Sequence, residues 1–409
     1  MVNISKFVPW KTIVRRTAKK HGFLDPITLM GKMRNFSQPS EVSEPIELVR
    51  AGAYFHARGL INARTIQNNM DWIWPYWVEE QFDPTSESFI PRAFSITHIN
   101  MTHRNWTAVG IPGYDAYPVV DPRGLVTPFW DGWSLDAWIV GEDQKLIPSK
   151  VDNVRQDLVL DDETYSVSTI AEQNGLSLKS NIRVEIENEE PVLKMTYTAK
   201  ADEDADFVLS LRPYNPEGIS FVDEIQYEAG SWTVGERHVA FDEEPASHHA
   251  SNYAEGDVYR KLNSAGSESG ISCKAGLANA AASYALKAGE SREITFRVNL
   301  LEEPEAKSMV NPGSDRHSWA KQLDGTAKLD IPDKRMQHIY DAAVRSLILM
   351  SPDWTYPGPY TYKRFWYRDA ALIINGLLDV NLTETAEQIL DRFPEKQTLT
   401  GFYHSQEGE

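Results

Sequence analysis

The middle of the chain alternates apolar and polar positions with a period of two residues. From Leu176 to Ile186 every second side chain is aliphatic or small, and shorter runs around Leu193, Phe207 and Ile294 repeat the pattern. Polar turns separate these runs. Many short strands at this spacing are typical of an antiparallel sandwich or barrel, so we predict a β-sandwich. The polar stretch 243–269 is predicted to be a long exposed loop.

The period changes near residue 330, where amphipathic helices are predicted to begin. Pro332 and Asp333 are typical of a helix start. Asp369 is predicted to cap a second helix, and Asn381, followed three residues later by Glu384, resembles the capping box of a third. The first helix has helically spaced apolar residues at Met336, Ile339, Tyr340, Ala343, Leu347 and Ile348.

These patterns divide the chain into three parts. Residues 1–58 form a basic helical leader, with eight Lys and Arg residues and one Asp among the first 34. Residues 59–325 form the sandwich domain, including the aromatic-rich segment that leads into it. Residues 326–409 form the helical part. The basic leader could touch an anionic surface, dock on an acidic neighbour or stay solvated.

Composition narrows the class of protein. Among the 409 residues, 41% are apolar and 24% charged, as in soluble globular proteins. No apolar run is long enough to span a membrane, and the N-terminus lacks a secretory pattern. A single cysteine, Cys273, excludes an intrachain disulfide and favours a reducing, cytoplasmic location. The net charge of −18 argues against a nucleic-acid partner.

Several kinds of chemistry lack support in the sequence. His98 and His103 are five residues apart and His248 adjoins His249, and neither pair has the spacing of metal ligands. Glycine-rich phosphate loops and a Gly-x-Ser-x-Gly motif are absent. We therefore expect no metal site, no cofactor and no serine-hydrolase activity.

The most informative segment surrounds Trp366, Arg368 and Asp369, at a predicted loop-to-helix junction. A carboxylate at such a junction stays ionised, and a neighbouring guanidinium offers a planar set of donors. Together they can bind paired hydroxyls of a sugar, while the indole offers an apolar face to its ring. The alternative is an ordinary helix cap beside a surface arginine.

The pattern Trp366-x-Arg368-Asp369, an apolar helix and then Glu384-Thr-Ala386 resembles a segment of the six-hairpin glycosidases. These include glucoamylases, amylo-α-1,6-glucosidases and disaccharide phosphorylases. The resemblance covers about residues 330–409. It implies an antiparallel β-sandwich followed by an (α/α)₆ barrel, of which this chain holds only the first helices.

The resemblance also implies a function. The parent protein is expected to be an inverting glycoside hydrolase acting on α-linked glucose oligosaccharides without a cofactor. Arg368 and Asp369 would bind the non-reducing-end sugar, with Trp366 beside them. Glu407 and Glu409 are further candidates for substrate binding, or else two solvated loop acids. The catalytic acid and base are expected beyond residue 409, so the chain would be an inactive fragment.

Two alternatives to a hydrolase stay open. One is a disaccharide phosphorylase of the same barrel class, and the other is a non-catalytic carbohydrate-binding or scaffold protein. A tryptophan-rich region adds a related question, since seven of the twelve tryptophans lie between residues 72 and 138. They could stack on sugars, but we favour a packed core or an interdomain seam.

Overall fold

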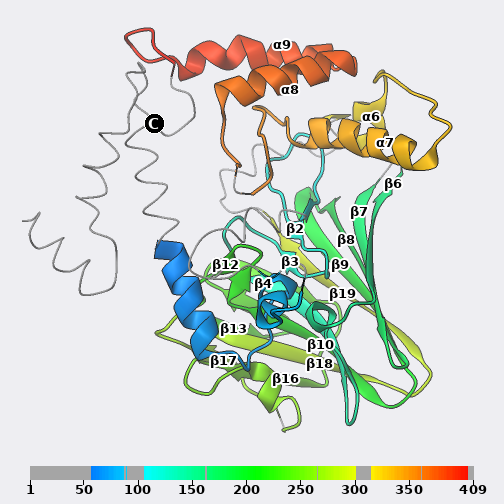
Figure 1. The fold of residues 1–409 in the computed structure, drawn as a ribbon, viewed down its shortest axis with the longest axis vertical. Coiled ribbons are helices and arrows are strands. Elements are labelled where there is room, and N and C mark those ends of the chain that lie inside the picture. The colour runs from blue at the N-terminus through cyan, green and yellow to red at the C-terminus, as the bar shows by residue number, and fades with distance from the viewer. Residues whose placement is uncertain are drawn as a thin grey trace, which may run out of the picture.

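The computed structural model describes residues 57–86, 89, 106–161, 164–264, 266–300, 315–360 and 362–403. Two large antiparallel sheets pack face to face, and helices lie across one end of them (Figure 1). The predicted β-sandwich followed by helices is thus confirmed. The basic leader lies outside the described residues except for positions 57 and 58, which lie in a helix described through residue 68.

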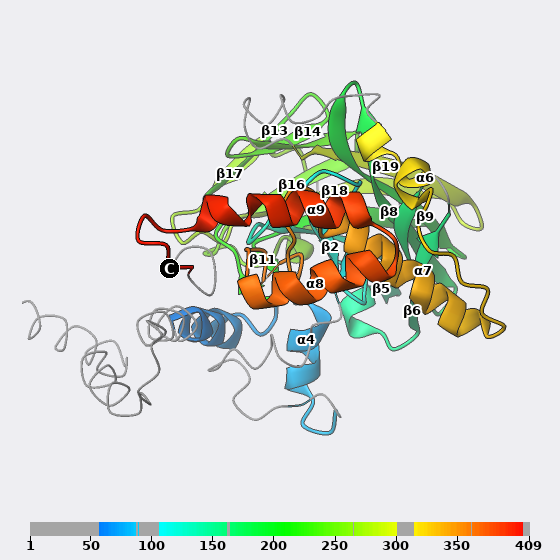
Figure 2. The same cartoon turned by 90° about the horizontal axis from the view of Figure 1, so that it is seen from above.

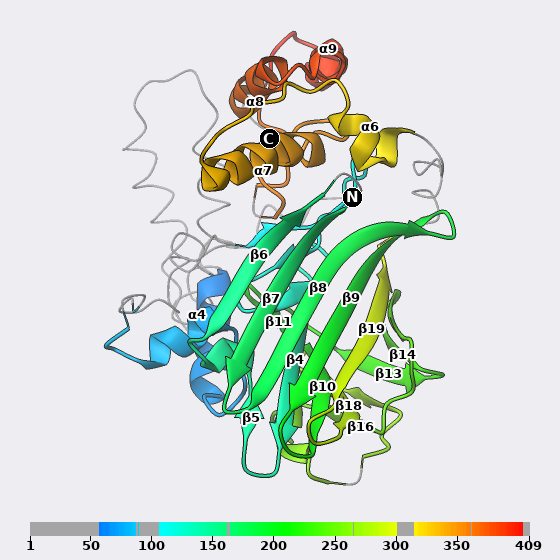
Figure 3. The same ribbon diagram turned by 90° about the vertical axis from the view of Figure 1, so that its right-hand side faces the viewer.

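One layer is a nine-stranded sheet whose long strands form the broad face seen in Figure 3. Its strongest pairing joins β8 and β9 over their full lengths. In spatial order its strands are β17 (Gly270–Ser272), β13 (Glu224–Glu228), β14 (Ser231–Val234), β15 (Arg237–Phe241), β19 (Ser291–Asn299), β9 (Glu190–Ala201), β8 (Leu176–Glu187), β7 (Tyr165–Gln173) and β6 (Val154–Leu160).

The second layer is an eight-stranded sheet centred on β4 and β10. A short hairpin of β11 (Tyr214–Asn215) and β12 (Gly218–Ile219) follows β10. In spatial order the strands of the sheet are β1 (Thr107–Ala108), β2 (Val119–Val120), β3 (Val126–Thr127), β4 (Ser134–Gly141), β10 (Ala205–Arg212), β18 (Asn279–Leu286) and β16 (Ser247–Ser251), with β5 (Lys145–Leu146) also paired to β4.

The period of two arises because each long strand has one face in the core between the sheets. On β8, Leu178 and Ile182 are buried in that core, while Lys179 between them is exposed. Aromatic rings fill the centre: Phe207 of one sheet stacks on Phe296 of the other at 6.2 Å. Burying such rings removes the most apolar area per residue from water and so stabilises the sandwich most.

The prediction of an exposed loop over residues 243–269 is wrong for its first part. Strand β16 pairs with β18 there, and His248 and His249 are buried. His248 stacks on Tyr227 with ring centroids 4.3 Å apart, and its Nε2 accepts a hydrogen bond from Trp232 Nε1 at 2.7 Å. Polar side chains can be buried in a strand when they have hydrogen-bond or stacking partners. A hydropathy pattern does not reveal such partners, so it predicted a loop here.

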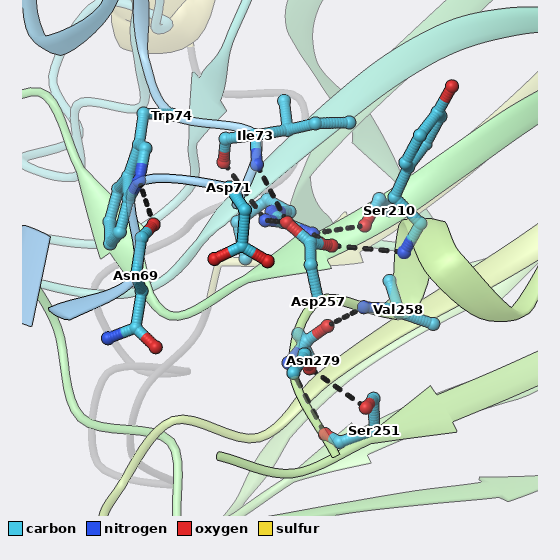
Figure 4. A network of polar contacts seen from close by, with 12 residues as sticks. Asn69, Asp71, Ile73, Trp74, Ser210, Ser251, Asp257, Val258 and Asn279 are labelled. Carbon is cyan, nitrogen blue, oxygen red and sulfur yellow. Dashed lines mark hydrogen bonds and ion pairs between the residues drawn. The ribbon is translucent and has the colours of Figure 1, made fainter. Parts of the chain in front are cut away.

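A buried ion pair holds the aromatic-rich segment around Ile73 against the outside of the second sheet (Figure 4). Arg212, at the end of β10, meets Asp257 in two hydrogen bonds of 2.8 and 2.6 Å and donates to the carbonyl of Ile73 at 3.0 Å. The N–H of Ile73 donates to the same carboxylate at 2.7 Å. Burial would raise the pKa of Asp257, but the charge and hydrogen bonds of the guanidinium and two backbone N–H donors together lower the pKa.

Most described tryptophans between residues 72 and 138 are core residues, as we favoured. Trp72, Trp74, Trp77, Trp133 and Trp138 are each at most 3% exposed. Two of them, Trp72 and Trp138, lie against the Arg212 guanidinium at cation–π distances of 5.9 Å and 5.3 Å. The short helix α4 (Tyr76–Glu79) continues this buried segment.

The helical part is a layer over the end of the sandwich. Helix α7 (Lys334–Leu349) packs on the sheets through Val344, Ile348 and Leu349. Figure 2 shows α8 (Tyr367–Asp379) and α9 (Thr383–Arg392) lying side by side above it. They share a small core of Ile374, Leu377, Ala386 and Ile389. The remaining helices are α6 (Trp319–Leu323) and the 3₁₀ turns Glu80–Phe82, Pro148–Lys150, Val258–Lys261, Asp315–His317 and Phe393–Lys396.

One of the three predicted helix caps is confirmed. Asp333 caps α7 by accepting from two backbone N–H groups at 2.9 and 3.0 Å. Asp369 is not a cap, because α8 begins two residues earlier with Trp366 at the N-cap position. Asn381 is not a cap either: its φ of +63° is left-handed, and its side chain donates to the carbonyl of Gly325 at 2.7 Å. Asn381 therefore ends α8.

The helices leave large apolar side chains uncovered. Met336 and Ile339, on the apolar face predicted for this helix, are 55% and 49% exposed because only the second half of α7 reaches the sandwich. On α8, Leu372 is 71% exposed. In the described part of the chain, no helix is long and apolar enough to cross a membrane.

Candidate sugar-binding site

A loop of about 17 residues joins α7 to α8 and carries the candidate motif. The loop is anchored by Phe365, which is 1% exposed. The Phe365 ring meets Trp354 and Tyr367 edge-on at 4.9 Å and Phe393, after α9, at 5.4 Å. This aromatic cluster connects the loop to the start of α8 and to the end of α9. The residues that follow Phe365 therefore have a defined position.

Trp366 is the first of the predicted site residues. It is half-buried at the N-cap position of α8, and its ring lies 6.1 Å from that of Tyr362. Its Nε1 is buried and has no hydrogen-bond partner among the described residues. Buried tryptophan N–H groups usually have an acceptor, so this donor is open to a ligand that displaces or reorients a neighbour.

Arg368 and Asp369 lie in the first turn of α8, one residue and two residues into the helix. Arg368 Nη2 is 3.6 Å from Asp369 Oδ2, with the two side chains 86% and 30% exposed. No hydrogen bond from a described residue reaches Asp369 Oδ2. Asp369 Oδ2 is itself buried, whereas the guanidinium of Arg368 is open to solvent and can bond a ligand directly.

Glu407 and Glu409 lie outside the described residues. The described part ends at Tyr403, whose ring meets Tyr367 at 5.0 Å in the first turn of α8. The chain thus returns to the motif shortly before these two glutamates. Their role in binding stays a prediction.

The loop that carries the motif provides no second uncommitted carboxylate for glycosidic cleavage. The other carboxylate of the loop, Asp353, forms an ion pair with Arg316. A hydrolase of this kind needs one protonated acid and one base on opposite sides of the bond. We therefore assign no catalytic residue.

The sandwich also reaches the motif loop, which the sequence did not reveal. Trp130, in the turn between β3 and β4, donates from Nε1 to the carbonyl of Tyr360 at 2.9 Å. Tyr360 is buried beside Asp131 and Glu217, and burial followed by these two charges raises its pKa. In the sequence, only the concentration of tryptophans near this turn pointed to this contact. That pattern does not distinguish the exposed Trp130 from the buried tryptophans around it.

A separate cavity of about 490 Å³ opens at the opposite end of β4. It is lined by Glu142, Asp204, Asp206 and Lys287 over an aliphatic floor, and no aromatic side chain lines it. Lys287 is already paired with Asp204 at 2.9 Å. The cavity shares no residue with the motif loop, so it is not part of the candidate site.

No protein-family model matches the sequence, and neither does any curated protein. Among solved structures, a bacterial glucoamylase complexed with acarbose is similar, with a TM-score of 0.52 and 10% identity over 74% of this chain and 52% of that chain. A protein described as a kojibiose phosphorylase from the human microbiome has a TM-score of 0.30 and 11% identity, covering 59% of this chain and 34% of that one. A family GH92 α-mannosidase from Bacteroides thetaiotaomicron scores 0.28 at 10% identity, covering 65% and 41%.

The similarity to the glucoamylase establishes the fold. It covers about three quarters of this chain, and the chain spans about half of that protein's length. At 10% identity the similarity does not extend to activity.

Proposed function

We propose that this chain belongs to a carbohydrate-active enzyme and binds the terminal glucose of an α-linked oligosaccharide at the start of α8. One observation carries the proposal: next to the exposed Arg368, Trp366 Nε1 and Asp369 Oδ2 are a buried donor and a buried acceptor, and described residues leave both without a hydrogen bond. Sugar hydroxyls both donate and accept, so a sugar that binds Arg368 and reorients these side chains can serve both groups.

The neighbouring side chains fit the same ligand. Arg368 is 86% exposed and offers several donors from one plane. Tyr362 and Trp366 supply aromatic surface beside them. The glucoamylase whose fold is similar was solved with acarbose, a fact about that protein that supports an oligosaccharide here.

For the reaction we propose hydrolysis with inversion, which requires two carboxyl groups roughly 6.5–9.5 Å apart. Asp369 is not one of them in this proposal, because it is assigned to binding the terminal sugar. We therefore expect residues 1–409 to bind sugars without cleaving them. A disaccharide phosphorylase remains the second candidate, since it needs one catalytic acid and a phosphate site.

The test combines binding and turnover. Titration calorimetry with glucose, maltose, isomaltose, trehalose and maltotriose should give saturable binding of α-glucosides, with cellobiose as the control that binds weakly. Glucose release from the same sugars should stay at background, with and without inorganic phosphate. Absence of saturable binding to every α-glucoside would refute the proposed ligand. Turnover above background would refute the placement of the catalytic groups.

A further inference from the structure

Trp130 is unusual among the tryptophans of the described part of the chain. Its side chain is 56% exposed, whereas its neighbours Phe129 and Trp133 are 4% and 3% exposed. Exposing an indole to water forgoes the free energy of burying it. A single exposed apolar residue is ordinary on a protein surface, so the case for Trp130 depends on how firmly it is held and on what it contacts.

The turn that presents Trp130 is held by many polar contacts. Asp131 has a left-handed φ of +50°, and its carboxylate lies 2.6 Å from the buried guanidinium of Arg58. Asn215 donates to the carbonyl of Gly132 at 3.0 Å, and Ser220 donates to that of Asp131 at 3.3 Å. The N–H of Gly132 closes the turn on the carbonyl of Phe129 at 3.1 Å. The backbone under Trp130 is therefore fixed before any ligand arrives.

The indole itself is also oriented. Its Nε1 donates to the carbonyl of Tyr360, and Tyr360 begins the stretch that leads to Trp366 and the first turn of α8. The bond holds the ring edge against the motif loop while more than half of the side chain stays open to solvent. A ring held in this way loses little conformational entropy when it binds a flat apolar surface.

We propose that Trp130 is an aromatic platform for a second sugar ring of the oligosaccharide whose terminal ring is held by Arg368 and Asp369. The inference rests on the proposed function and adds a specificity-determining residue from the sandwich. Trp130 comes from the β3–β4 turn, so it adds to the binding surface of α8 and favours chains longer than one glucose. Its contact with the sugar is apolar: the face of the indole packs on the C–H groups of the sugar ring.

The experiment compares glucose with maltopentaose in titrations of the 409-residue chain. Removing the platform in Trp130→Ala should raise the Kd for maltopentaose about tenfold, the change that corresponds to the apolar area of one ring face, and leave the Kd for glucose unchanged. Trp130→Phe, which keeps a flat ring, should bind maltopentaose nearly as wild type does. Tyr253→Ala is the matched control, since Tyr253 is an exposed aromatic residue, 41% exposed, that follows β16.

The outcomes separate this inference from the proposed function. Wild-type affinity of Trp130→Ala for maltopentaose would overturn the platform, while the site on α8 would still be supported if Asp369→Asn weakened both sugars. If Asp369→Asn changed nothing and Trp130→Ala weakened maltopentaose, Trp130 would bind sugar independently of α8, and both the site on α8 and the assignment of Trp130 to the second ring would be overturned. No binding of either sugar by the wild type would overturn both. Trp130→Leu, which keeps apolar bulk without a flat face, should behave as the alanine variant does and guards against misfolding of the latter.

Discussion

Replacing Asp369 with asparagine should separate a binding role from a structural one. In the first turn of α8 the carboxylate interacts with the helix dipole, which contributes about 0.3–1 kcal/mol. Its ion pair with Arg368 spans 3.6 Å at an arginine that is 86% exposed, and exposed pairs contribute about 0–1 kcal/mol. No cap is lost, because Asp369 is not one. The free energy of unfolding should therefore fall by only about 1 kcal/mol, a Tm shift of about 1 °C for a chain of 409 residues.

The effect on sugar binding should be larger. A charged acceptor that holds a sugar hydroxyl contributes about 1.5–3 kcal/mol, which corresponds to a rise in Kd of roughly 10- to 100-fold. The asparagine keeps the shape of the side chain and one acceptor oxygen. The change in Kd therefore reports the loss of the charge rather than a rearranged pocket.

Glu384→Gln is the matched control for this substitution. Glu384 lies in the first turn of α9, is exposed, and interacts with its own helix dipole in the same way. Thermal unfolding and calorimetric titration with maltotriose should give similar small Tm shifts for both variants but weaker binding only for Asp369→Asn. Equal losses of binding in the two variants, or a loss of stability at Asp369 of several kcal/mol, would refute the reasoning.

Three further predictions concern the stability and surface of the fold. Asp257→Asn leaves the buried Arg212 without its countercharge and should cost about 3–5 kcal/mol in urea unfolding, against less than about 1 kcal/mol for Asp157→Asn in an exposed pair. Burial raises the pKa of Asp121 from 3.8 to about 7. The folded chain therefore holds that proton more tightly than the unfolded chain, and stability should fall as pH rises through this range, less steeply in Asp121→Asn. Leu372→Lys removes an apolar side chain that is 71% exposed, so it should reduce binding of a hydrophobic dye without lowering Tm; an unchanged dye signal would place the dye elsewhere.

The order of the elements could be predicted from the sequence because it depends on local periodicity. The alternation in β8 and the helical spacing in the second half of α7 reflect which side chains meet the core. The first half of α7 shows the same spacing, yet Met336 and Ile339 are exposed. Periodicity indicates which residues share a face, and only the tertiary arrangement decides whether that face is covered.

Contacts between distant residues could not be predicted in this way. Arg212 and Asp257 are 45 residues apart, and the carbonyl of Ile73 is 139 residues from Arg212. No local pattern distinguishes such residues from surface charges. The same limit applies to the site: the residue types around Arg368 suggested a sugar, whereas the bond from Trp130 to Tyr360 spans 230 residues and emerges only from the fold.

Hydrogen–deuterium exchange with and without maltotriose tests the central claim most directly, because it locates the ligand on the chain. The account predicts slower exchange in the loop that begins at Tyr360 and in the first turn of α8 around Arg368 and Asp369, with no change at the far end of β4. Protection confined to the cavity beside Glu142 and Asp206, with none in the first turn of α8, would contradict it.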